Sequence, residues 1–170
     1  MDEQSNLRNF VNEISSFSDE GTAPKAAAAP AANLQSIGNV IEIAGSGSRI
    51  RMDGAVLAGL LNHPDPSVGM SGQVGSQVKM AVANSWLIAN VRTMKSGENG
   101  EVLAAIDFLG EGVRDSSGGM TNFRRGVTRY PIPGDKVLPV TTKDLRSVFA
   151  ASDEPHIEIG TVYPTDDIRG

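Results

Sequence analysis

The chain has 170 residues, a formal net charge of −5 and no cysteine, so it is long enough for one domain plus a tail and excludes disulfides and thiolate metal sites. Its 19 glycines and 5% aromatic residues favour a compact β-barrel with tight turns over a helical bundle. The net negative charge restricts any nucleic-acid contact to a local patch. No apolar run approaches the roughly 18 residues of a membrane span, so we predict a cytoplasmic protein without a membrane partner.

Residues 1–33 are predicted to be a disordered arm that carries a short amphipathic helix and an alanine- and proline-rich linker. The apolar residues of the helix recur at intervals of three and four, and they are Leu7, Phe10, Val11, Ile14 and Phe17. This helix could recruit a partner protein by laying its apolar face in a groove. Alternatively, it packs on its own barrel or on a neighbouring subunit, or stays disordered, and we favour these alternatives because so short a helix is marginal alone.

Residues 34–165 are predicted to form a small closed β-barrel of about six strands with one or two short helices. In the first strand, Ile41 and Ile43 alternate with Val40 and Glu42, which places the two isoleucines on one face.

A glycine-rich turn at residues 45–47 should lead into a second strand, in which Ile50 and Met52 alternate with charged residues. Asp53 is the expected cap of one or two helical turns over residues 56–61.

Residues 62–75 are predicted to be a long loop whose lone histidine, His63, is solvated and does not bind a metal. Two strands are expected over residues 76–94. A hairpin turn at Glu98-Asn99-Gly100 then leads into a strand at residues 101–109.

The strand at residues 101–109 is apolar on both faces, so both faces should be covered. One face carries Val102, Ala104, Ile106 and Phe108, and the other carries Leu103, Ala105 and Leu109. The cover could come from the loop after Asn62, from Trp86 or from an adjacent subunit. The glycine- and serine-rich residues 110–120 are predicted to be mobile.

Residues 124–140 combine the closely spaced Pro131 and Pro133, a Pro-Gly-Asp turn and three arginines. Pro131 and Pro133 fix φ and lack a backbone donor, so residues 130–133 should be extended, at an edge or in a connection. Pro133-Gly134 fits the centre of a type II turn, and residues 136–140 should leave it as a strand.

A short helix and a closing strand are predicted after this segment. Thr142 is the expected helix cap, and the apolar residues at helical spacing are Leu145, Val148 and Phe149. The closing strand should contain Ile157, Ile159 and Val162, and residues 166–170 are expected to be a tail.

Three motifs in residues 37–162 resemble the N-terminal barrel, called the HAS barrel, of HerA-like hexameric DNA-translocase ATPases. They are Phe123-Arg124-Arg125-Gly126-Val127, then Tyr130-Pro131-Ile132-Pro133-Gly134-Asp135 with Val137, and then Ile157-Glu158-Ile159-Gly160-Thr161. The resemblance implies a domain that assembles a homo-oligomer, a hexamer in the full-length protein, and docks a partner. That partner would be a nuclease of the NurA type acting on DNA ends or an effector of anti-phage defence, with DNA contacted through the assembled ring.

We expect no catalytic, cofactor-binding or metal-binding residue in this chain, and therefore no enzymatic activity. A phosphate-binding loop needs a lysine followed by serine or threonine after its glycines, and neither residues 45–47 nor residues 118–119 lead into one. The resemblance implies that ATP and Mg²⁺ bind in a motor domain beyond residues 166–170. No Gly-x-Ser-x-Gly elbow is present either.

The docking surface implied by the rigid turn and the adjacent arginines comprises Arg124, Arg125, Arg129, Tyr130, Pro131, Pro133, Gly134 and Asp135. Arg114, Arg124 and Arg125 could instead contact DNA phosphates. We favour pairing of the arginines with carboxylates of a neighbouring subunit, because the acidic chain supplies such partners.

Two further functions stay open from the sequence. One is a nucleic-acid-binding barrel of the OB type, against which the scarcity of well-placed aromatics counts, since only Trp86, Phe123 and Tyr130 qualify. The other is a structural barrel of a phage particle.

Overall fold

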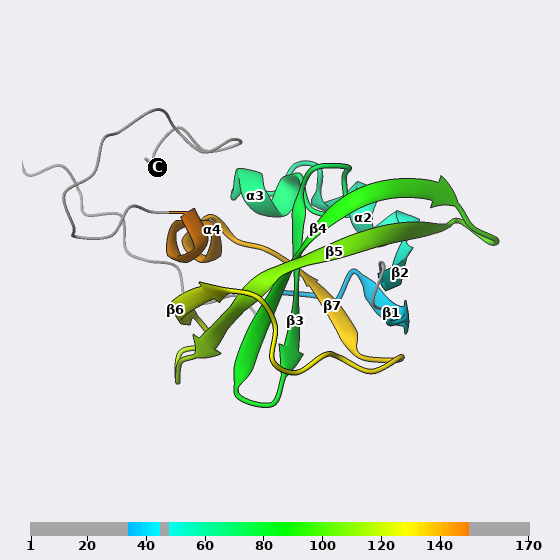
Figure 1. The fold of residues 1–170 in the computed structure, drawn as a ribbon. Coiled ribbons are helices and arrows are strands. Elements are labelled where there is room, and N and C mark those ends of the chain that lie inside the picture. Colours follow the sequence, from blue (N-terminus) through cyan, green and yellow to red (C-terminus); the bar gives the residue numbers. More distant parts are fainter. Residues whose placement is uncertain (1–33, 45–47, 150–170) are drawn as a thin grey trace, which may run out of the picture. The chain divides into compact units, whose positions relative to one another are not determined.

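The computed structural model describes residues 34–44 and 48–149. The strands are β1 (Gly38–Glu42), β2 (Ser48–Asp53), β3 (Gln77–Val82), β4 (Ser85–Ser96), β5 (Glu101–Arg114), β6 (Met120–Arg125) and β7 (Lys136–Pro139). The helices are α2 (Gly54–Leu60), α3 (Pro66–Gly69) and α4 (Thr142–Phe149) (Figure 1). The predicted arm, the turn at residues 45–47, the final strand and the tail lie outside the described residues.

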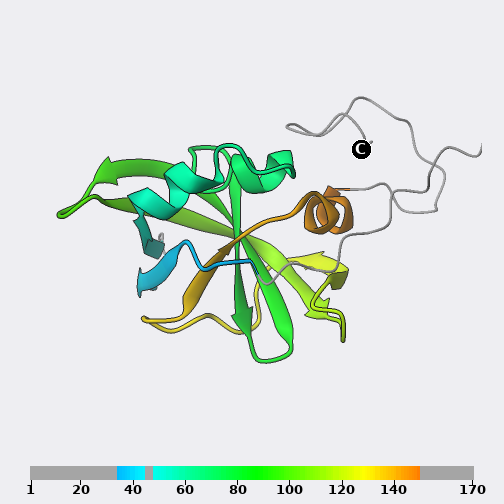
Figure 2. The same cartoon turned by 180° about the vertical axis from the view of Figure 1, so that it is seen from behind.

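Six antiparallel strands form a closed barrel in the order β2-β1-β7-β3-β4-β5, and pairing of β2 with β5 closes the ring. The prediction of a small closed β-barrel of about six strands is therefore confirmed. The 14-residue β5 makes this closure possible: one edge follows β4, while the other pairs first with β2 and then with β6. Figure 2 shows the β4–β5 hairpin reaching past β2.

Most of the predicted turns and caps are confirmed. At the hairpin tip, Asn99 has a φ of 52° and Gly100 a φ of 80°, as a type I′ turn requires. Asp53 caps α2 by accepting hydrogen bonds from the backbone N–H groups of Ala55 and Val56. No helix within the described ranges is long and apolar enough to cross a membrane.

Two apolar clusters stabilise the barrel. The first fills its interior and contains Ile37, Val40, Ile50, Met52, Val78, Met80, Ala89, Val91, Ala104, Ile106 and Val137. The second lies under α4 and contains Trp86, Ile88, Met120, Val140 and Leu145. Leu109 packs against this second cluster, so Trp86 contributes to covering the far face of β5, one of the alternatives left open by the sequence. Leu103 and Ala105 on that face are half-buried.

The predicted alternation in the first strand is wrong because β1 contains a bulge. The register with β2 shifts between Val40 and Glu42, so Ile41 is an extra residue. An extra residue reverses the faces of those that follow it. Val40 is therefore buried in the barrel, Ile43 packs partly against the same cluster, and Ile41 is half-buried.

The loop predicted at residues 62–75 contains the short helix α3, which Asp65 caps by accepting from the Ser67 N–H. His63 accepts a hydrogen bond at Nδ1 from the Asp65 N–H. The assignment of residues 110–120 to a mobile segment is also wrong. β5 continues to Arg114, and Asp115 then fixes a tight turn by accepting at Oδ1 from the N–H groups of Ser117 and Gly119.

Candidate docking surface

The predicted docking residues lie on β6 and on the connection from residue 126 to residue 135, which leads into β7. Tyr130 is 56% exposed and Ile132 is 66% exposed, both high values for large apolar side chains. We call Arg125, Arg129, Tyr130 and Ile132 the rim patch. Pro131 is buried, so its assignment to the docking surface is corrected: it supports the connection from within.

The connection is held rigidly, as the two prolines predicted. The Asp135 N–H donates to the Ile132 carbonyl over 3.0 Å and Gly134 has a φ of 100°, which confirms the Pro133-Gly134 turn. The Asp135 carboxylate accepts from the Ile132 N–H at 2.8 Å, and the Gly134 N–H donates to the Val40 carbonyl at 2.8 Å. These bonds tie the turn to β1.

The other half of the connection is anchored on β5. The Tyr130 ring meets the Phe108 ring edge to face, with centroids 5.5 Å apart and an interplanar angle of 75°. Glu111 is buried and accepts hydrogen bonds from Arg124 Nε and Nη2, from the Thr128 N–H at 3.1 Å and from Thr128 Oγ1 at 2.8 Å. These donors, Arg124 first and Thr128 second, lower the pKa of Glu111 to about 2.

We expect Glu111→Gln to lower the urea midpoint of unfolding at neutral pH, followed by the fluorescence of the single tryptophan, Trp86. The folded-state pKa of about 2 lies below the ordinary value of 4.5, so the stabilisation by Glu111 is complete above pH 4.5 and is lost as the pH falls towards 2. The gap between parent and variant should therefore narrow across that window. A gap independent of pH, or an equal loss in the exposed control Glu98→Gln, would contradict the assignment.

The four arginines singled out from the sequence do not form one free cluster. Arg124 is bound to Glu111, and the Arg114 guanidinium lies 5.1 Å from the centre of the Trp86 ring. Among the described residues, Arg125 and Arg129 form no ion pair with a carboxylate. These two arginines are therefore the ones that could pair with a carboxylate or phosphate of a partner.

The charge is distributed unevenly along the chain. The described residues contain 12 Lys and Arg against 10 Asp and Glu, a net charge of +2. Because the whole chain has a net charge of −5, the remaining segments carry −7. The barrel is therefore slightly basic, and the acidity that was expected to supply partners for the arginines lies outside the described residues.

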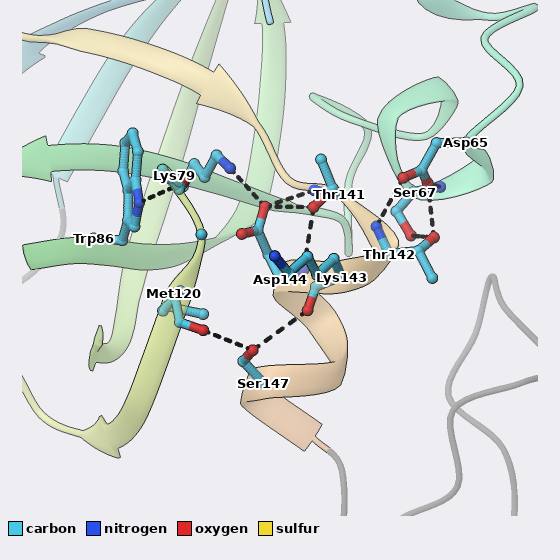
Figure 3. A network of polar contacts seen from close by, with 12 residues as sticks. Asp65, Ser67, Lys79, Trp86, Met120, Thr141, Thr142, Lys143, Asp144 and Ser147 are labelled. Atoms are coloured by element: carbon cyan, nitrogen blue, oxygen red, sulfur yellow. Dashed lines mark hydrogen bonds and ion pairs between the residues drawn. The ribbon is translucent and has the colours of Figure 1, made fainter. Parts of the chain in front are cut away.

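A buried polar network positions α4 (Figure 3). Lys79 Nζ lies 2.6 Å from Asp144 Oδ2, and the two side chains are only 7% and 3% exposed. The same carboxylate oxygen accepts from the N–H and Oγ1 of Thr141, whose Oγ1 in turn accepts from the Asp144 N–H. This reciprocal arrangement is a capping box, so the cap of α4 is Thr141 and the prediction of Thr142 was wrong by one residue.

Thr142 instead joins α4 to α3. Its N–H and Oγ1 both donate to the Asp65 carboxylate, at 3.0 Å and 2.7 Å. Further along α4, Ser147 Oγ donates to the Met120 carbonyl at 2.9 Å, which fixes the helix against β6 (Figure 3). Sequence reasoning missed this network, although a lysine within the apolar run Val78-Lys79-Met80 was a signal for a buried ion pair.

Comparison with known proteins adds no assignment: no protein-family model matches the chain, and none of the curated proteins matches it.

Within the described ranges, no group of three or more His, Cys, Asp or Glu side chains is placed to share a metal ion.

Proposed function

We propose that this chain is the assembly and partner-docking domain of a HerA-like DNA translocase. In this proposal the barrel contacts copies of itself in a ring, and the ring recruits a nuclease or a defence effector. Catalysis belongs to a motor domain outside this chain, which would bind ATP and Mg²⁺ and act on DNA passing through the ring. The observation that carries the proposal is the rigid, exposed rim patch on a closed barrel.

The chemistry of the rim patch suits a protein partner. Tyrosine and arginine are enriched at the energetic centres of interfaces, and exposed isoleucine adds apolar area to bury. The patch is also preorganised, because Glu111 fixes one end of the connection and β1 fixes the other. A preorganised surface loses little conformational entropy on binding. The residues of this segment are also those that resemble the HerA-like barrel.

Ile132→Asp should weaken self-association about tenfold or more, because it places an unpaired charge where apolar area would be buried. Sedimentation velocity over a range of protein concentrations measures this. Leu61→Asp is the matched control: Leu61, the C-cap of α2, is 62% exposed and is not part of the rim patch, so this change should leave association unchanged. An equal effect of both variants, or a chain that stays monomeric at all concentrations, would contradict the proposal.

The net charge of +2 on the described residues favours a second candidate, a barrel that contacts nucleic-acid phosphates through Arg125 and Arg129. A titration with labelled DNA at several salt concentrations distinguishes it. Tight binding with a steep salt dependence that is reduced in the Arg125→Glu/Arg129→Glu variant would favour this candidate over docking of a protein.

A further inference from the structure

The tip of the β4–β5 hairpin carries Asn99-Gly100, the only Asn-Gly pair in the sequence. The backbone nitrogen that follows an asparagine can attack the side-chain amide of that asparagine. A side chain on the following residue hinders this attack, whereas glycine has no side chain and the widest choice of backbone conformations. Asn99 is therefore the asparagine of this chain with the most reactive sequence context.

The structure leaves both reacting groups accessible. Asn99 and Gly100 are exposed at the end of the long hairpin (Figure 1). A hydrogen bond of 2.9 Å from the Glu101 N–H to the Glu98 carbonyl closes the turn. The Gly100 N–H donates to no acceptor among the described residues, so this nitrogen can react without losing a hydrogen bond of its own.

The other described asparagines are better protected. For three of them, the backbone N–H of the next residue is already engaged in a hydrogen bond, namely Val40 after Asn39, His63 after Asn62 and Val91 after Asn90. The remaining two, Asn84 and Asn122, precede Ser85 and Phe123, which lie within strands and carry side chains. Within the described ranges, an exposed turn, a following glycine and an unengaged N–H coincide at Asn99 alone.

We propose that Asn99 is a site of spontaneous deamidation. The Gly100 nitrogen forms a bond to Asn99 Cγ, the bond from Cγ to the amide nitrogen breaks, and the Gly100 N–H proton leaves with the amide as ammonia. Water then opens the resulting succinimide ring at either of its carbonyls, which gives aspartate or isoaspartate. Water is the only co-reactant, and nothing is oxidised or reduced. The proposal does not depend on self-assembly or on the rim patch.

Isoaspartate changes the backbone of the turn, because the chain then runs through the former side chain and gains one methylene group. The turn depends on positive φ angles at its two central residues, 52° at Asn99 and 80° at Gly100. An extra backbone atom alters the length of the turn and so disturbs the hydrogen bond between Glu101 and Glu98. The new carboxylate also lies between these two glutamates, and like charges repel.

The tip is joined to α2 and to the closure of the barrel. The N–H of Gly54, the first residue of α2, donates to the Gly100 carbonyl at 3.1 Å, and a Cβ on Gly54 would lie only 2.4 Å from that oxygen. The pairing of β2 with β5 that closes the barrel ends beside this contact, at Asp53 and Glu101. Isoaspartate at position 99 should therefore loosen the start of α2 and the last pair of the closing ladder.

Incubation of the full-length chain at mildly alkaline pH, followed by digestion and mass spectrometry, tests the site. We expect Asn99 to be converted several-fold faster than Asn84 or Asn122, with isoaspartate among the products. The rate should rise with pH, because the attacking nitrogen must lose its proton. Asn99→Gln is the matched variant: its side chain would have to close a larger ring, so the peptide should stay unconverted over the same time. Conversion of Asn99 no faster than that of Asn84, or formation of aspartate alone at a rate independent of pH, would overturn the proposal.

Hydrogen exchange of the isoaspartate form, separated by ion exchange, tests the structural consequence. Amides of α2 and of the Asp53 end of β2 should exchange several-fold faster than in the parent chain, while β3 amides stay unchanged. Asn99→Asp adds the same charge without the extra methylene and should exchange like the parent. Equal exchange in the isoaspartate form and in Asn99→Asp would overturn the coupling of the tip to α2.

Discussion

Asp144→Ala is expected to destabilise the barrel by about 3–5 kcal/mol, because it leaves the Lys79 ammonium buried without a counter-charge. The variant also removes the acceptor of the Thr141 N–H and so weakens the start of α4. Urea unfolding followed by circular dichroism at neutral pH measures the loss. Asp107→Ala, which removes the exposed pair with Arg92, should cost less than about 1 kcal/mol.

The double variant Lys79→Met/Asp144→Leu tests whether the cost comes from the unpaired charge. Replacing both partners by apolar side chains removes the desolvation penalty together with the attraction, so most of the stability should return. A double variant as unstable as Asp144→Ala would instead assign the loss to the hydrogen bonds of Thr141.

Gly110→Ala is expected to be the second strongly destabilising change, by about 3 kcal/mol. A Cβ at this position would lie 2.1 Å from the Arg124 carbonyl oxygen and 2.7 Å from the Phe123 ring, so β6 has to move away from β5. Because β6 carries Arg124 and Arg125, we also expect self-association to weaken. Thermal unfolding and sedimentation of the same preparation measure both effects.

Gly59→Ala is the control for Gly110→Ala. Gly59 lies within α2, and a Cβ there would meet no atom within 4 Å. Alanine should stabilise this helix by about 0.5–1 kcal/mol. Similar losses in the two variants would contradict the steric explanation.

Much of the barrel could be predicted because its signals are local. The alternation of Ile50 and Met52, the turn at Asn99-Gly100 and the turn at Pro133-Gly134 each depend on a few neighbouring residues. Features that depend on distant partners were missed. The bulge at Ile41 depends on register with β2. The glycine-rich residues 110–120 predicted a mobile segment, but Gly110 and Gly112 of β5 instead allow the close approach of the extra strand β6.

The candidate site was predicted in part for the same reason. The extended, proline-stiffened connection follows from its own sequence, whereas the pairing of Arg124 with Glu111 joins residues on two strands. The sequence contains both residues but does not indicate that the Arg124 and Glu111 side chains form an ion pair. The two arginines without described partners, Arg125 and Arg129, could be separated from Arg114 and Arg124 only by the structure.

The position of β7 has a consequence for synthesis of the protein. β7 lies between β1 and β3, and it pairs Val137 with Gly38 and with Met80. A nascent chain can form the local hairpins early, but the barrel cannot close until β7, which ends at Pro139, has left the ribosome. Until then β1 and β3 each expose an unpaired edge, so fragments that end before residue 136 should be prone to aggregate, and complete chains should fold slowly for their size.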